Sequence, residues 1–106
     1  MPKFLIEASY TQDGLKGLMS EGGSKRRAAV DKLLASVGGK VEVFYFAFGA
    51  RDLFIVADLP DNVTAAAVSM TVNASGAAKS NATVLLSPEE VDAATKKSVP
   101  YRAPGQ

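Results

Sequence analysis

The segment from Val41 to Asp61, which reads VEVFYFAFGARDLFIVADLPD, constrains the fold of this chain more than any other. It holds two runs of aromatic and β-branched residues on either side of Gly49-Ala50, a pattern that predicts a β-hairpin. Alternate residues of a strand point to opposite faces of the sheet, and here both alternate sets are largely apolar. We therefore expect both faces of the hairpin to be covered.

The sequence does not decide which segment packs on the second face of the hairpin. A two-residue and a three-residue turn at Gly49-Ala50 give opposite strand pairings, but both faces stay apolar in either register. Crossover helices cover one face only, and one alternate set of the first strand carries Phe44, Phe46 and Phe48. Either the C-terminal helix or tail of the same chain folds over the second face, or the sheet of a second copy packs there. We favour the second copy, which predicts a homodimer or higher oligomer.

Length and charge exclude several protein classes. The chain has 106 residues, and we expect a single domain over residues 1–95 and a tail over residues 96–106 with two prolines and a glycine. A net charge of +1 provides no general attraction to nucleic acid or to anionic lipid. No apolar run is long enough for a membrane span, and the first residues lack a signal-peptide pattern, so we expect a cytoplasmic protein.

Cysteine and histidine are both absent. Disulfides, thiolate catalysis and Ser-His or Cys-His nucleophilic pairs are therefore impossible within the chain. No spacing of carboxylates indicates a metal site, so we expect no metal and no cofactor. Ligand binding, or acid–base chemistry by Lys, Asp, Glu or Tyr, is what this composition allows.

The order of predicted elements indicates an α+β fold. Strands are expected over Lys3–Tyr10, Val41–Phe48 and Asp52–Asp58, with a fourth that includes Thr83–Leu86. The polar turn Thr11-Gln12-Asp13-Gly14 and a single helical turn at Leu15–Met19 follow the first strand. The three predicted helices are one capped by Ser24 and ended by Gly38-Gly39, one capped by Asp61 and ended by Gly76, and a short one opened by Ser87-Pro88-Glu89-Glu90.

This order is the ferredoxin-like βαββαβ pattern with a short C-terminal helix, in which two helices cover one face of an antiparallel sheet. Within the helix capped by Asp61, one stripe at helical spacing is expected to face the core. Its members are Val63, Ala66, Ala67, Met70 and Ala74.

Several blocks of the sequence resemble the GYD-domain proteins. These blocks are EGGSKRRAAV, GGKVEVFYFAFGARD, LPDNVTAAA, ASGA and TVLLSPEE, and they extend over roughly residues 3–91. The Gly-Tyr-Asp element of that family falls at Gly49–Asp52 with one intervening residue, and Arg51 stands where tyrosine is usual. The resemblance implies a small bacterial protein with a ferredoxin-like fold that forms a dimeric α/β barrel, and it implies no particular activity.

The first candidate site is the run Gly22-Gly23-Ser24-Lys25-Arg26-Arg27 at a predicted helix start. Free backbone N–H groups and the helix dipole favour an anion there, whereas three cations at this end need compensation. Lys25 and Arg26 are accordingly candidate ligands for a small anionic molecule. The alternative is a solvated helix start with salt bridges to acidic side chains, because the spacing of a P-loop is missing.

The second candidate site is the predicted hairpin tip. Asp52 could orient a ligand or act as a base in a cleft, with Tyr45 as proton donor. The alternative is that Asp52 satisfies backbone groups of the turn while Arg51 is solvated. Tyr10 and Tyr45 also fit the pattern of aromatic residues at the edge of a core.

Two function classes follow. The leading interpretation is a homo-oligomeric ligand-binding or regulatory module that uses the cleft between sheet and helices or the subunit interface. The alternative is a cofactor-independent isomerase or oxygenase-like enzyme of the dimeric α/β barrel type, an interpretation based on fold analogy. A purely structural assembly subunit is a third interpretation, and it predicts no pocket.

Overall fold

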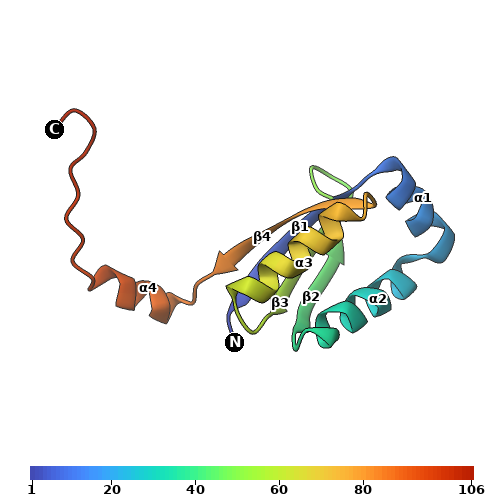
Figure 1. Cartoon of the computed structure of the whole chain (residues 1–106), viewed down its shortest axis with the longest axis horizontal. Helices are drawn as coiled ribbons and strands as arrows, with labels where there is room; N and C mark the ends of the chain where they lie inside the picture. Colours follow the sequence, from blue (N-terminus) through green and yellow to red (C-terminus); the bar gives the residue numbers. More distant parts are fainter.

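The computed structural model describes residues 1–106 and shows the element order βααββαβα (Figure 1). The strands are β1 (Lys3–Tyr10), β2 (Lys40–Phe46), β3 (Leu53–Asp58) and β4 (Ala78–Leu85). The helices are α1 (Gln12–Glu21), α2 (Gly23–Ser36), α3 (Asn62–Ala74) and α4 (Pro88–Thr95). The predicted α+β class is confirmed. The structure has one helix, α1, in addition to those of the βαββαβ pattern with a C-terminal helix.

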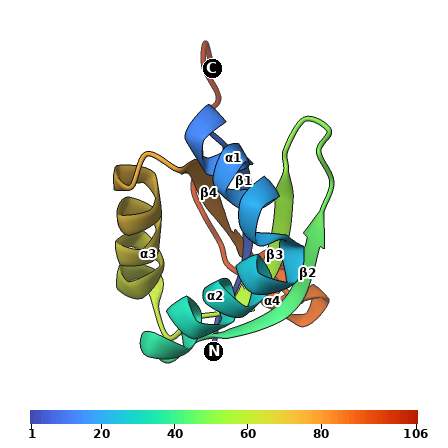
Figure 2. The same ribbon diagram turned by 90° about the vertical axis from the view of Figure 1, so that its right-hand side faces the viewer.

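The four strands form one antiparallel sheet in the order β2-β3-β1-β4. Strands β1 and β3 lie in the middle, as in the expected split βαβ arrangement. Figure 2 shows α2 and α3 on the same side of this sheet. The core lies between these helices and the sheet, and its largest fully buried side chains are Leu34 and Leu59.

A β-bulge at Glu42 decides how β2 presents its side chains. Val41 pairs with Ala57, but the next paired residue of β2 is Val43, opposite Val56. One residue is therefore skipped, and the alternation of β2 changes phase. The helix-covered face receives Val41, Phe44 and Phe46, whereas Val43 and Tyr45 point to the opposite face. The three Phe residues of one predicted alternate set are therefore separated, because Phe44 and Phe46 lie on the helix-covered face and Phe48 lies in the loop after β2.

The turn between β2 and β3 is wider than predicted. The last pair of the ladder is Phe46 with Leu53, and the N–H of Ala47 donates to the carbonyl oxygen of Asp52 at 3.0 Å. Phe48 adopts a positive φ of 55° within the loop. Neither a two-residue nor a three-residue turn at Gly49-Ala50 occurs, because the strands separate before these residues.

Helix α1 is longer than the single turn expected at Leu15–Met19. Thr11 caps it by accepting a hydrogen bond from the N–H of Gly14, and the Thr11 hydroxyl donates to the carbonyl oxygen of Gly76 at 2.7 Å. A Cβ on Gly14 would lie 1.8 Å from the carbonyl oxygen of Ala77. The absence of a side chain at Gly14 therefore lets α1 begin directly against the loop before β4.

A single glycine separates α1 from α2. Gly22, with φ at 86°, is both the C-cap of α1 and the N-cap of α2. Its positive φ is a conformation that glycine adopts without steric cost. The prediction that Ser24 caps this helix is wrong, because α2 starts at Gly23 and has no side-chain cap.

Helix α3 faces the core with a different stripe from the predicted one. Asp61 caps it as predicted, accepting a hydrogen bond from the N–H of Thr64 at 2.7 Å. The inward residues are Ala65, Val68 and Val72, whereas Val63 and Met70 are 79% and 67% exposed. Because α3 contains no charged residue, its sequence does not distinguish the inner from the outer face.

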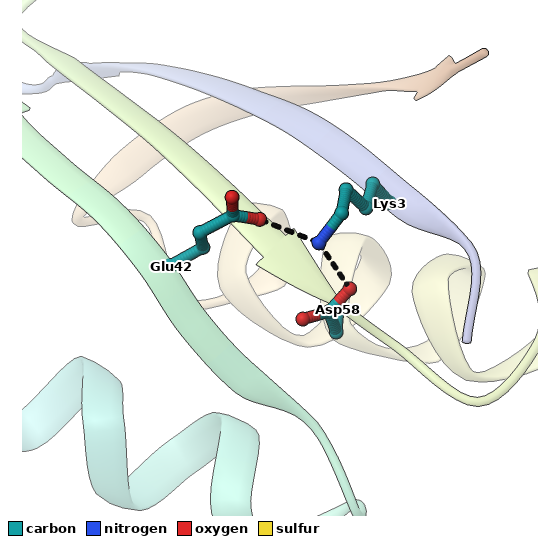
Figure 3. A network of polar contacts seen from close by, with 3 residues as sticks. All are labelled: Lys3, Glu42 and Asp58. Carbon is teal, nitrogen blue, oxygen red and sulfur yellow. Dashed lines mark hydrogen bonds and ion pairs between the residues drawn. The ribbon is translucent and has the colours of Figure 1, made fainter. Parts of the chain in front are cut away.

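The second face of the sheet is left open by the chain. Five apolar or aromatic side chains on β1, β2 and β3 lie there, and together they form what we call the open-face patch: Leu5, Val43, Tyr45, Phe54 and Val56. At one end of this face, the ammonium group of Lys3 donates to Glu42 at 2.6 Å and to Asp58 at 2.9 Å (Figure 3). These hydrogen bonds, that to Glu42 first, raise the pKa of Lys3 above 10.5.

The C-terminal helix does not cover the open face. Helix α4 and the residues after it point away from the sheet (Figure 1), and no residue of α4 is buried. Of the two covers considered for this face, the intramolecular one is therefore contradicted by the structure. None of the helices combines the length and the apolar character that crossing a bilayer would require.

Candidate functional site

A cavity of about 370 Å³ lies between α2, α3 and the helix-covered face of the sheet. Hydrophobic residues make up 15 of the 20 that line it. Small side chains on α3 and β4 leave this space open, because alanine and serine cannot fill the gap between the two helices. The small residues at the cavity include Ala65, Ser69, Ala78, Ser80 and Ala82.

Arg26 is the only charged residue at the cavity. Its side chain is 36% exposed overall, yet its Nε atom is buried and has no hydrogen-bond partner. The nearest carboxylate oxygen, Oε1 of Glu21, lies 3.6 Å away, which is close enough for an ion pair and too far for a good hydrogen bond. Burying an N–H without a hydrogen-bond partner costs free energy. A ligand whose acceptor bonds to Nε of Arg26 would therefore bind more tightly.

Tyr10 lies at the same end of the cavity. Its ring is half-buried, and this burial raises the pKa of the phenol above 10.0. The charge of Arg26 acts in the opposite direction, while the nearby carboxylates of Asp52 and Glu21 raise the pKa of Tyr10 further. The raised pKa keeps the Tyr10 phenol a hydrogen-bond donor at neutral pH, and a guanidinium such as that of Arg26 has donors and no acceptor, so the cavity lining offers donors and contains no general base.

A second, more polar hollow of about 350 Å³ adjoins this end. It shares Tyr10, Arg26, Ser75 and Ala77 with the cavity, and only 3 of its 10 lining residues are hydrophobic. Its carboxylates are those of Asp13 and Glu21. The arrangement is an apolar cavity that adjoins, at Arg26 and Tyr10, a more polar hollow with two carboxylates.

The cation run at the start of α2 is separated by the structure into three environments. Arg26 reaches the cavity, Arg27 pairs with Asp31 at 3.2 Å, and Lys25 is exposed and takes part in no ion pair. Acidic side chains of α1 and α2 thus compensate two of the three cations. This supports the salt-bridge interpretation of the helix start over a dedicated anion site.

The hairpin residues are also separated. Asp52 accepts a hydrogen bond from the backbone N–H of Tyr10 at 2.8 Å, and its own N–H donates to the carbonyl oxygen of Ala8 at 2.9 Å. Asp52 therefore ties the hairpin loop to the end of β1. Its carboxylate serves a backbone group, as the structural alternative expects, but that group belongs to β1 and not to the turn, and Arg51 pairs with Glu7 at 3.7 Å. Tyr45 belongs to the open-face patch and is 69% exposed, so it lies across the sheet from the cavity and cannot act with Asp52 there.

Of the four predicted site residues, Arg26 lies at the cavity and Asp52 supports the Tyr10 backbone beside it, whereas Lys25 and Tyr45 lie elsewhere. The sequence pattern indicates only that Tyr10 lies at the edge of the core. The run of small residues ASGAAKSNA at the end of α3 and in β4 was the available signal for a space above the sheet. No group of three or more Asp, Glu, His or Cys side chains could hold a metal ion.

Comparison with known proteins gives one match. The model of the family described as GYD domain matches residues 4–95, a span that ends at the last residue of α4. No curated protein and no solved structure shows a significant match.

Proposed function

The chain belongs to the GYD domain family, and we propose that it is a homo-oligomeric protein that binds a small, mainly apolar molecule between α2, α3 and the sheet. The observation that carries this proposal is the cavity itself, with its apolar lining and one buried, unpartnered N–H of Arg26. Pockets for small ligands are typically apolar concavities of about 300–1,000 Å³ with a few placed polar groups.

The lining decides the class of ligand. Each apolar methylene that leaves water for the cavity contributes about 0.8 kcal/mol, so a six-carbon apolar group gains about 5 kcal/mol before the costs of association. One hydrogen-bond acceptor on the ligand would satisfy Nε of Arg26, and the Tyr10 phenol is a second donor at the same end. A ligand with an apolar body and one carbonyl or ether oxygen fits these groups.

A small anionic ligand, expected from Lys25 and Arg26, fits less well. A carboxylate at Arg26 would compete with Glu21 and lie beside the two carboxylates of the more polar hollow, where like charges raise its free energy. Comparing an aliphatic acid with its amide tests this point. A neutral acceptor should bind at least as tightly as the acid.

We prefer a binding function to the enzyme alternative, a cofactor-independent isomerase or oxygenase-like activity. Acid–base catalysis needs a group that accepts a proton near neutral pH. Neither Arg26 nor Tyr10 does so, and Tyr45 and Asp52 do not meet at a common site. The geometry therefore supports a binding or regulatory module.

Self-association is the second part of the proposal. The open-face patch leaves apolar side chains on a face that the chain itself does not cover. Two copies that cover each other's open faces would bury both patches, which agrees with the dimer expected from the family resemblance. Sedimentation of the full chain at micromolar concentration tests this: a dimer is expected, and a clean monomer would contradict it.

Fluorescence titration tests the binding site. The apolar dye N-phenyl-1-naphthylamine should show saturable enhancement with the full chain. Ser69→Leu, which fills the cavity from α3, should abolish it, whereas Ala67→Leu on the exposed side of the same helix should not. Far-ultraviolet circular dichroism controls for folding. Equal dye binding by both variants would defeat the proposal.

A further inference from the structure

We infer that the C-terminal arm, defined as residues 86–106, packs on the open-face patch of a second copy of this chain. The inference rests on the self-association proposed above and goes beyond it, because it assigns a binding partner to an element that has none within its own chain.

The arm stands apart from the body of the protein. The radius of gyration is 16.8 Å, whereas a compact chain of this length is expected near 13 Å. The longest dimension is 55 Å, and Figure 1 shows α4 and the residues after it extending away from the sheet. None of the α4 residues is buried.

A helix as short as α4 needs a packing surface. It has 8 residues, and isolated helices shorter than about 12–15 residues are marginal in water. A capping box stabilises its start: Ser87 accepts from the N–H of Glu90, and the Glu90 carboxylate accepts from the N–H of Ser87. Such caps stabilise the first turn only, so the helix as a whole requires tertiary or intermolecular contacts.

The extent of the family match points the same way. It includes α4 to its last residue, Thr95, so α4 is part of the domain rather than an appended tail. A domain element without a packing partner in its own chain is explained if the partner is another chain.

The arm carries the apolar side chains that such a contact needs. Val91 and Ala94 share one side of α4 at helical spacing, and exposed Leu86, Val99 and Tyr101 flank the helix. The three cations after α4 are balanced by Glu89, Glu90 and Asp92 of α4, and on the open face Lys3 already pairs with Glu42 and Asp58. The complementarity of the arm and the open face therefore rests on apolar surface.

The dimensions also agree. Four strands about 4.8 Å apart present a face about 15 Å wide, and eight helical residues extend about 12 Å. Helix α4 therefore crosses most of a sheet, and the residues after it reach the edge. In a two-fold pair each arm meets the sheet of the other copy, so each contact is made twice.

Paramagnetic relaxation in a mixed sample tests the inference on the full chain. Because the chain has no cysteine, Lys97→Cys carries a nitroxide label at a single exposed site. Labelled chain is mixed with unlabelled, ¹⁵N-enriched chain, so that only contacts between copies broaden signals. We expect broadening at Leu5, Phe54 and Val56, and none at Val63 and Met70 on the outer side of α3.

Each of the other possible results would overturn the contact between the arm and the second copy. A dimer without broadening would overturn the arm contact and leave self-association intact. In a separate sample, one chain carries both the nitroxide and ¹⁵N and is diluted with unenriched chain. Broadening in that sample without broadening in the mixed one would mean that the arm folds on its own sheet, which also overturns the inference. A monomer in sedimentation would overturn both proposals. Independently, Val91→Asp should weaken the dimer about tenfold or more, since burying valine contributes about 1.5 kcal/mol or more; an unchanged dissociation constant would contradict the arm contact.

Discussion

Replacing Gly14 by alanine tests the contact on which the polar end of the site is built. The new Cβ would lie 1.8 Å from the carbonyl oxygen of Ala77 and 2.8 Å from its carbonyl carbon, so α1 must move by roughly 1.5 Å. That shift breaks three hydrogen bonds by which Thr11 is attached to this loop: its N–H to Ala77 at 3.0 Å and its hydroxyl to Gly76 and Ala77 at 2.7 and 3.2 Å.

The magnitude follows from opposing contributions. Overpacking against backbone costs about 1–3 kcal/mol, and the weakened hydrogen bonds are part of that cost. Alanine restores about 1 kcal/mol of helix propensity relative to glycine. Gly14→Ala should therefore lower the free energy of unfolding by up to about 2 kcal/mol, equivalent to a decrease of up to roughly 1 M in the urea midpoint.

Gly17→Ala is the matched control in the same helix. A Cβ at Gly17 meets nothing within 4 Å, so this variant should gain about 0.5–1 kcal/mol. Urea unfolding followed by far-ultraviolet circular dichroism measures both. If Gly14→Ala were as stable as Gly17→Ala, the close approach of α1 to Ala77 would be refuted.

Three further predictions concern titration. Burial raises the pKa of Tyr10 above 10.0, so ultraviolet absorbance should show one of the three tyrosines titrating late, and Tyr10→Phe should remove that phase and no other. Hydrogen bonding by Thr64, from its backbone N–H first, lowers the pKa of Asp61 below 3.8. The resulting stabilisation of the folded state is complete above pH 3.8 and is lost as the pH falls through the lowered pKa. Acid unfolding of Asp61→Asn should not show this loss. Hydrogen bonds to Glu42 and Asp58 raise the pKa of Lys3, so their stabilising effect is complete below pH 10.5 and is lost as the pH rises through the raised pKa; alkaline unfolding of Lys3→Gln should lack this loss.

The strands and the fold class were predictable because the apolar runs are long and their order is distinctive. The register of β2 was not, because the bulge at Glu42 depends on how β2 meets β3, which no local pattern records. Thr-Gln-Asp-Gly fits both a turn and a helix start, and the approach of Gly14 to Ala77 selects the helix. In α3 the absence of charge left the inner face undetermined.

The candidate site was predictable in part for similar reasons. Arg26 was predictable as a site residue because a cation at a helix start is unfavourable unless it is compensated. In the structure Glu21 compensates its charge, and its side chain lines the cavity. Tyr10 did not stand out, because its position matters only once α2 lies over the end of β1. A cavity formed by small side chains on elements far apart in the chain has no motif of its own.

Mapping a bound apolar ligand by ¹H–¹⁵N chemical shifts is the most direct test of the central claim. With N-phenyl-1-naphthylamine added to the full chain, the largest saturable shifts should occur at Ile6, Val30, Ser69 and Ala82, which line the cavity. The amides of Lys79 and Thr83, whose side chains point to the open face, should move much less than that of Ala82 between them. Absence of saturable shifts, or shifts centred on the open face, would contradict the account.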